Sequence, residues 1–137
     1  MTETPTFSGH CYCGALSYTV TGKPLGKAQC HCRECQYISG GGPNYFMVLP
    51  RNGFIWTSGT PQTFTRTDID GAVTRCFCGT CGTHITSELP DGQRTVLKVG
   101  TLDDPSVYKG PKAAIYTVDQ QPFHVIPDDL PCFEGLP

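Results

Sequence analysis

The sequence lacks long apolar runs, clusters of basic residues and any strong excess of charge. Its apolar stretches fall far short of the roughly 20 residues that cross a membrane as a helix, so we expect no membrane segment. The formal net charge is −2 and no Lys/Arg run is present, which disfavours nucleic acid as a partner. The N-terminal residues MTETPTFSGH contain neither a basic region nor an apolar run, so we expect no secretory signal and a cytoplasmic protein.

Glycine, proline and cysteine are the residues that stand out. The chain of 137 residues contains 16 Gly, 12 Pro and 9 Cys, and its length suits one domain over residues 1–137. A turn-rich composition with few charged residues favours a mainly β protein over a helical one. Nine cysteines in a reducing compartment indicate metal ligands or reactive thiols and not a disulfide framework.

Short runs between turn residues predict an antiparallel β fold. In residues 16–21 (LSYTVT), apolar and hydroxyl side chains alternate, as in a half-buried strand. Further strands are expected where Val, Ile, Thr and aromatic residues gather, at 44–49, 54–57, 62–67, 73–77, 83–86, 95–99 and 115–118. Only residues 33–39 could form about two helical turns, directly after a cysteine-rich loop.

Two cysteine pairs predict a closed metal site. Cys11 and Cys13 form a C-x-C pair, and Cys78 and Cys81 form a C-x-x-C pair flanked by glycines. The second pattern is typical of a zinc knuckle, in which a tight turn points backbone N–H groups at the sulfurs. A knuckle supplies two of the four thiolates of a structural Zn²⁺ site, and the C-x-C pair can supply the others. The alternative is that some of these residues are ordinary buried cysteines.

A third group, Cys30, Cys32 and Cys35, predicts a different site. Three sulfur ligands from one loop select Zn²⁺, Cu⁺ or an iron–sulfur cluster, and three protein ligands with an open fourth position are typical of catalytic zinc. The open position could hold water or a substrate thiolate. Cys76 could be the fourth ligand, a reactive thiol or a buried cysteine, and we favour the last reading.

Several other residues could have functional roles. His31 could shuttle a proton near the metal, but an exposed loop histidine is the preferred interpretation. His84 and His124 are expected to be surface or satisfied core residues, and Cys132 a free or packed thiol. Four arginines could bind carboxylates but are expected to be solvated surface charges: Arg33, Arg51, Arg66 and Arg75.

The cysteine pattern resembles that of the glutathione-dependent formaldehyde-activating enzyme family, whose domain is also found in centromere protein V. The matching motifs are GHCYCGA at 9–15, CHCRECQ at 30–36, RCFCGTCGT at 75–83, GTLDDP at 100–105 and DDLP at 128–131. The resemblance implies a β-tent fold of small stacked antiparallel sheets. It also implies two Zn²⁺ per chain. One is structural, on Cys11, Cys13, Cys78 and Cys81, and one is catalytic, on Cys30, Cys32 and Cys35.

The activity implied by the resemblance is that of a carbon–sulfur lyase. Such an enzyme forms or breaks S-hydroxymethylglutathione, so a small thiol such as glutathione and an aldehyde are the expected partners. One alternative is a zinc-binding module or thiol-adduct carrier without catalysis, which binds a protein partner or a small thiol. Another is a redox enzyme of the methionine sulfoxide reductase type, with Cys76 or Cys132 as nucleophile. Zinc coordination lowers the pKa of a thiol, and an enzyme and a carrier of the adduct would need the same open metal site.

Overall fold

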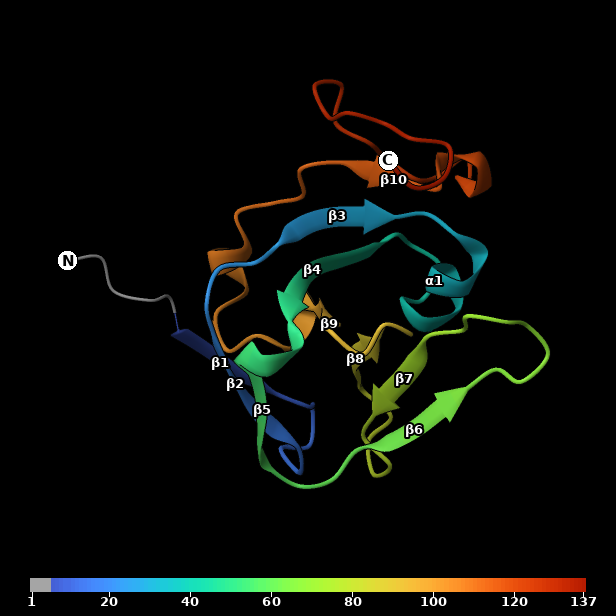
Figure 1. Ribbon diagram of the computed structural model, residues 1–137. Coiled ribbons are helices and arrows are strands. Elements are labelled where there is room, and N and C mark those ends of the chain that lie inside the picture. The colour runs from blue at the N-terminus through green and yellow to red at the C-terminus, as the bar shows by residue number, and fades with distance from the viewer. Residues whose placement is uncertain (1–5) are drawn as a thin grey trace.

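The computed structural model describes residues 6–137 and is mainly β, as the sequence predicts (Figure 1). Its strands are β1 (Thr6–His10), β2 (Ser17–Thr21), β3 (Gly26–Cys30), β4 (Asn44–Pro50), β5 (Phe54–Ser58), β6 (Gln62–Thr65), β7 (Thr74–Phe77), β8 (His84–Glu88), β9 (Arg94–Lys98) and β10 (Ala114–Ile115). The α-helix is α1 (Arg33–Ile38), and four short 3₁₀ helices are Arg51–Gly53, Val99–Thr101, Pro105–Tyr108 and Thr117–Asp119. No helix in residues 6–137 is long and apolar enough to cross a membrane.

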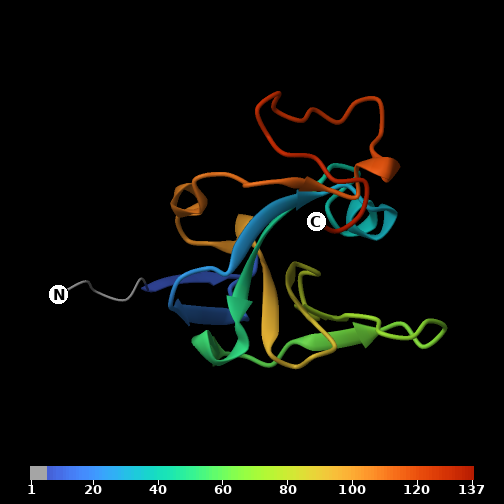
Figure 2. The same cartoon turned by 45° about the horizontal axis from the view of Figure 1, so that its top comes forward.

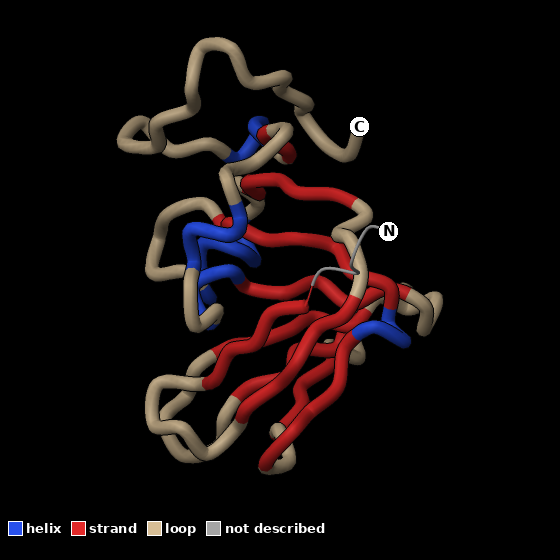
Figure 3. Tube along the Cα trace, turned by 90° about the vertical axis from the view of Figure 1, so that its left-hand side faces the viewer, coloured by secondary structure: helices blue, strands red, loops and turns tan. Residues whose placement is uncertain are grey.

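The strands form two sheets. The smaller has the order β1-β2-β5, and the larger has the order β10-β3-β4-β9-β8-β7-β6. Figure 3 shows the strands side by side along the molecule, with helical turns and long loops at their ends. All the pairings are antiparallel except one, because β10 runs parallel to β3 with Ile115 opposite Cys30. The larger sheet is therefore mixed, whereas the sequence predicted antiparallel pairing throughout.

Alternating side chains of β4 serve two apolar clusters. Met47 and Leu49 belong to the main core, together with side chains of the smaller sheet. Phe46 and Val48 point to the opposite face and belong to a second cluster that includes Cys30 and Cys35. Since successive side chains of a strand alternate between faces, the larger sheet is covered on both sides. Cys30 and Cys35 are therefore packed within the second apolar cluster.

Helix α1 lies at one end of the molecule between two parts of the chain. The segment after β10 lies on one side of α1 and the β6–β7 hairpin on the other, and Figures 1 and 2 agree on this arrangement. The helix confirms the expected turns at 33–39, and its N-cap is Cys32. The loop of three cysteines therefore sits where β3 ends and α1 begins.

Two strands were missed from the sequence, and the end of a third was misplaced. Strands β1 and β3 were not predicted, because TFSGH and GKAQC contain glycine and few β-branched residues. The expected strand at 115–118 is wrong beyond Ile115. Tyr116 adopts a left-handed conformation with φ of 54°, and a 3₁₀ turn follows. A left-handed residue cannot continue a strand.

Candidate metal centres and the adjoining cavity

The first cysteine group comes together as predicted from four positions in two loops. The sulfurs of Cys11, Cys13, Cys78 and Cys81 lie within 4.8 Å of one another. The Cys11–Cys13 and Cys13–Cys78 sulfur distances are both 3.7 Å. Tetrahedral bonds of about 2.3 Å to Zn²⁺ would separate two sulfurs by about 3.8 Å. The group could therefore hold a metal ion, and its spacing fits zinc.

Backbone N–H groups point at the sulfurs of this group. Those of Thr80 and Cys81 lie 3.4 and 3.5 Å from Cys78 Sγ, and Gly82 closes the turn with φ of +79°, a conformation that favours glycine. Hydrogen bonds from the side chain and backbone of Thr83 lower the pKa of Cys81 to about 5. The knuckle geometry thus favours the thiolate of Cys81, and the thiolate is the form that binds metal.

The second group also comes together. Cys30 ends β3, Cys32 caps α1 and Cys35 lies in its first turn, and their sulfurs lie within 4.8 Å of one another. The backbone N–H of Cys35 donates to Cys32 Sγ at 3.3 Å. Hydrogen bonds from the Cys30 and Cys35 thiols hold the pKa of Cys32 well below its ordinary value, while the same contacts raise the pKa of Cys30. One thiolate, on Cys32, is therefore favoured before any metal binds.

No other His, Cys, Asp or Glu of residues 6–137 joins this group of three. Cys76 is buried in β7, and burial raises the pKa of its thiol, so the preferred interpretation of a buried cysteine is confirmed. A raised pKa also disfavours Cys76 as a nucleophile. Cys132 is exposed and donates to the carbonyl of Leu130 at 3.3 Å. The second group could therefore hold a metal ion with three ligands from the described chain.

A cavity of about 970 Å³ lies beside the three cysteines, all of which line it. Helix α1 contributes one wall, and strands β6, β7 and β8 contribute the wall opposite. Much of the surface is apolar, with Ile38, Phe46, Phe64, Phe77 and Val96 among its side chains. A metal at the three-cysteine site would therefore be open to a ligand of substantial size.

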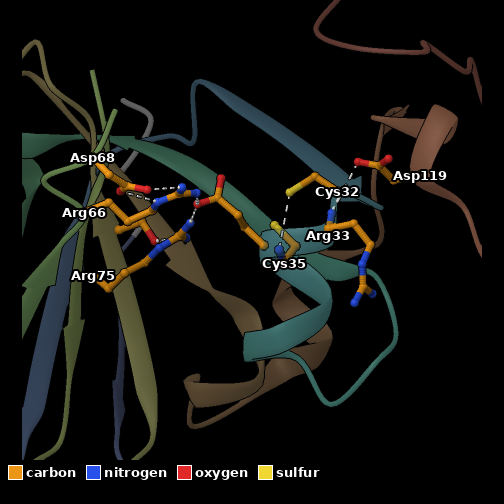
Figure 4. A network of polar contacts seen from close by, with 9 residues as sticks. Cys32, Arg33, Cys35, Arg66, Asp68, Arg75 and Asp119 are labelled. Atoms are coloured by element: carbon orange, nitrogen blue, oxygen red, sulfur yellow. Dashed lines mark hydrogen bonds and ion pairs between the residues drawn. The ribbon is translucent and has the colours of Figure 1, made fainter. Parts of the chain in front are cut away.

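Charged side chains at the cavity are tied to one another (Figure 4). Glu34 pairs with Arg66 at 3.4 Å and with Arg75 at 3.8 Å, and Arg66 also pairs with Asp68 at 2.8 Å. Arg75 donates to Ser87 Oγ at 3.1 Å. Its side chain is only 16% exposed, so the expectation of a solvated surface charge is wrong for Arg75.

The other three arginines differ in their surroundings. Arg51 is half exposed and pairs with Glu88 at 3.1 Å, and Arg66 is 41% exposed, so both agree with the expected surface charge. The Arg33 guanidinium donates to the side chain of Gln36 and lies over the Tyr37 ring. Its backbone N–H donates to Asp119 at 3.4 Å, which ties the start of α1 to the segment after β10.

Lys98 places a buried ammonium on the sheet face that carries the second cysteine group. Lys98 lies opposite Phe46, and Phe46 lies opposite Ala28, two residues before Cys30. Directly opposed and alternate residues share one face of a sheet. Burial lowers the pKa of Lys98 to about 8, and the neighbouring cysteines, Cys35 first among them, oppose that shift when they are ionised. Three thiolates on a divalent metal carry net negative charge, which the ammonium of Lys98 would offset.

Only two buried side-chain N or O atoms of residues 6–137 have no hydrogen-bond partner, Lys98 Nζ and His84 Nδ1. His84 lines the cavity and stacks on Phe77 with ring centroids 5.3 Å apart. Burial lowers the pKa of His84. The expectation of a surface or satisfied core residue is therefore wrong for His84.

His31 is fully buried, so the preferred interpretation of an exposed loop histidine is wrong. Its ring contacts Gln29 at 3.0 Å and His124 at 2.9 Å. His124 is also buried, and its Nε2 lies 2.7 Å from the carbonyl oxygen of Gly41, so the expectation of a satisfied core residue is confirmed for His124. The segment that carries His124 covers the cysteine loop. Because His31 and His124 are far apart in the sequence, no local pattern predicts their contact.

The family model described as glutathione-dependent formaldehyde-activating enzyme matches residues 6–119. The chain belongs to this family. The match covers both cysteine groups and α1, and it confirms the resemblance seen in the cysteine motifs. Membership links the chain to glutathione and formaldehyde through the name of the family.

One solved structure supports the fold of this family member. The crystal structure of a Rhodobacter sphaeroides protein superimposes with a TM-score of 0.58 at 17% identity, over 70% of this chain and 87% of that one. An identity this low shows a shared fold alone. No curated protein matches the sequence.

Sequence reasoning about this family member found the cysteines and missed their polar surroundings. All seven predicted ligands lie in the two expected groups. Lys98 was not singled out, although it ends a strand in which Thr95 and Leu97 are buried on the alternate face. A lysine at the end of an alternating strand is usually solvated, so only the tertiary packing identifies it.

Proposed function

We propose that this protein is a zinc-dependent enzyme of the carbon–sulfur lyase type, which forms or breaks the bond between a glutathione-like thiol and an aldehyde. One observation carries the proposal. Cys30, Cys32 and Cys35 converge at one end of a large cavity, and no fourth ligand from residues 6–137 joins them. Catalytic zinc sites keep such a position free for a substrate or water.

The two cysteine groups take different roles in this proposal. Cys11, Cys13, Cys78 and Cys81 hold a structural Zn²⁺, because four thiolates close its coordination. Cys30, Cys32 and Cys35 hold a catalytic Zn²⁺, and all-sulfur donors favour zinc over the harder Mg²⁺ or Ca²⁺. When bound there, zinc supplies a position where a substrate thiol is deprotonated near neutral pH, and it can polarise the aldehyde oxygen.

Charged residues around the three-cysteine site balance its charge and connect the walls of the cavity. The ammonium of Lys98 offsets the charge of the thiolates from the face of the sheet. The Glu34–Arg75 pair joins α1 to β7 and so holds the two cavity walls together. In the reaction the thiol loses its proton, its sulfur bonds to the carbonyl carbon, and the carbonyl oxygen gains a proton. No electron donor or acceptor is required.

The expected partners are a small thiol such as glutathione and an aldehyde, and the expected compartment is the cytoplasm. None of the nine cysteines forms a disulfide in the structure, and a reducing compartment keeps cysteines in that form. A three-thiolate centre needs those thiols reduced in order to bind metal.

Exchange spectroscopy tests catalysis itself. Formaldehyde reacts with thiols unaided, so the exchange rate between free glutathione and S-hydroxymethylglutathione is measured by NMR with and without the zinc-loaded protein. We expect faster exchange with the wild type and with Cys132→Ser, and no acceleration with Cys32→Ser. If glutathione binds but the exchange rate equals that without protein, the enzyme assignment falls and a carrier of the thiol adduct replaces it.

A further inference from the structure

We propose that the cavity beside the three-cysteine site selects a thiol adduct whose aldehyde-derived part is large and apolar. The substrate aldehyde would then carry an alkyl or aryl chain, in contrast to the single carbon of formaldehyde. This inference rests on the proposed function, since it concerns the second substrate of the same site.

The size of the cavity exceeds what formaldehyde requires. Its volume is about 970 Å³, at the upper end of the roughly 300–1,000 Å³ found for sites that take drug-sized ligands. Formaldehyde adds only two heavy atoms to the thiol. A cavity of this size leaves room beside a bound thiol for a much longer aldehyde chain.

The apolar wall begins at the cysteines themselves. Phe46 belongs to the same buried cluster as Cys30 and Cys35, and Val96 packs against that cluster. Phe46 and Val96 also line the cavity, and Phe77 lines it from β7. A chain on the carbon bonded to the substrate sulfur would therefore meet apolar side chains as soon as it leaves the metal site.

The rim of the cavity carries exposed apolar side chains from α1, the β6–β7 hairpin and the C-terminal segment. Tyr37, Phe64, Ile69 and Leu136 are 80%, 59%, 44% and 69% exposed, and all four line this cavity. Apolar side chains that gather around one opening mark a binding site, whereas single ones are ordinary. An apolar ligand would remove part of their surface from water.

The charged side chains of the cavity are paired with one another, and among the described residues that line it only His84 presents a buried polar side-chain atom without a hydrogen-bond partner. Glu34, Arg66 and Arg75 are ion-paired with one another, and Arg75 also donates to Ser87. A ligand rich in charged groups would have to break these pairs or leave its own groups unpaired. Glutathione itself is highly charged, so the apolar surface is better matched by the aldehyde-derived part of the adduct.

The chemistry of the step does not depend on the size of the aldehyde. The thiol S–H bond breaks, a C–S bond forms at the carbonyl carbon, and the π pair of the carbonyl passes to oxygen, which takes a proton. The product is a hemithioacetal, and breakdown is the reverse. Neither direction oxidises or reduces a substrate.

Calorimetry with stable thioethers tests the inference on the zinc-loaded protein. S-hexylglutathione mimics the adduct of a long aldehyde and S-methylglutathione that of formaldehyde. We expect the hexyl compound to bind wild type at least about tenfold more tightly, because burial of two of its additional methylenes suffices for that gain. Phe64→Ser should remove most of the difference and leave binding of the methyl compound unchanged. The matched control is Ile55→Ser, an exposed apolar residue of β5 in the other sheet, which should retain the wild-type difference.

The possible outcomes separate this inference from the proposed function. Equal affinity of the two thioethers, with glutathione still bound at the metal, overturns the inference alone. Failure of glutathione to bind, while Phe64 still governs a preference for the hexyl compound, overturns the proposed function and supports an apolar site. A preference that Ile55→Ser reduces as much as Phe64→Ser would reflect non-specific adsorption and would overturn the inference. If neither glutathione nor a thioether binds, both proposals fall.

Discussion

The Nδ1 atoms of His31 and His124 lie 2.9 Å apart inside the protein, so one of them must donate and the other accept. His124 Nε2 lies 2.7 Å from the carbonyl oxygen of Gly41, which can only accept, and therefore carries the proton. Neutral His124 then accepts at Nδ1, and His31 donates from Nδ1. His31 Nε2 in turn accepts from the amide of Gln29 at 3.0 Å. Both nitrogens of His31 are thus occupied in fixing the cysteine loop.

This histidine pair predicts a loss of stability in acid. Burial, followed by the repulsion between the two rings when both are protonated, holds the pKa of His31 below its ordinary value of 6.5. As pH falls through 6.5, the unfolded chain takes up a proton that folded His31 resists, so the free energy of unfolding decreases by up to about 1.4 kcal/mol per pH unit. In His31→Gln this slope should be shallower between pH 6.5 and 5. Denaturant unfolding at several pH values measures it.

The matched control for that slope is His10→Gln. The side chain of His10 is 55% exposed and lies 3.5 Å from Asp103, away from the cysteine loop. His10→Gln should retain the fall in stability between pH 6.5 and 5 that is assigned to His31. An unchanged slope in His31→Gln would contradict the role assigned to the buried pair.

The two metal sites should differ in their contribution to stability. Cys78→Ser removes a buried ligand from a closed set of four cysteines, and structural zinc contributes directly to folding. We expect this variant to lose several kcal/mol, or to fail to fold. Cys32→Ser changes a half-buried residue that lines the cavity and should retain the fold, with loss of thiol binding. Thermal unfolding of both variants decides the matter, and equal destabilisation would count against a catalytic role for the three-cysteine site.

Replacement of Lys98 tests the charge balance at the second site. Lys98→Met keeps the length of the side chain and removes the ammonium, which should weaken metal binding by Cys30, Cys32 and Cys35 by about 10- to 100-fold. Competition with a chromophoric chelator measures that affinity. Lys112→Met removes the same charge from an exposed residue and should leave the affinity unchanged. Equal effects of the two variants would show that only overall charge matters.

The sequence predicted the cysteine sites because their signals are local. Glycines beside Cys78 and Cys81 indicate the tight turn, and the short spacing of Cys30, Cys32 and Cys35 allows their sulfurs to meet. The pairing of Cys13 with Cys78 across 65 residues followed from the need for four ligands.

Contacts without a local signal were missed. His31 appears as a polar residue in a loop until the segment carrying His124 covers it. The strand Gly26–Cys30 has few strand-forming residues, and its place in the sheet comes from pairing with β4 on one side and β10 on the other. The expected strand at 115–118 ends early because Tyr116 takes a left-handed conformation, which a tyrosine in the sequence does not predict.

Cobalt substitution tests the central claim that the three-cysteine site takes a substrate thiol as its fourth ligand. The account predicts two Co²⁺ per chain and, on addition of glutathione, a rise in sulfur-to-cobalt charge-transfer absorption as one thiolate joins one of the two ions. The rise should disappear in Cys32→Ser and remain in Cys132→Ser. An absorption spectrum that glutathione leaves unchanged, with both sites loaded, would contradict the account.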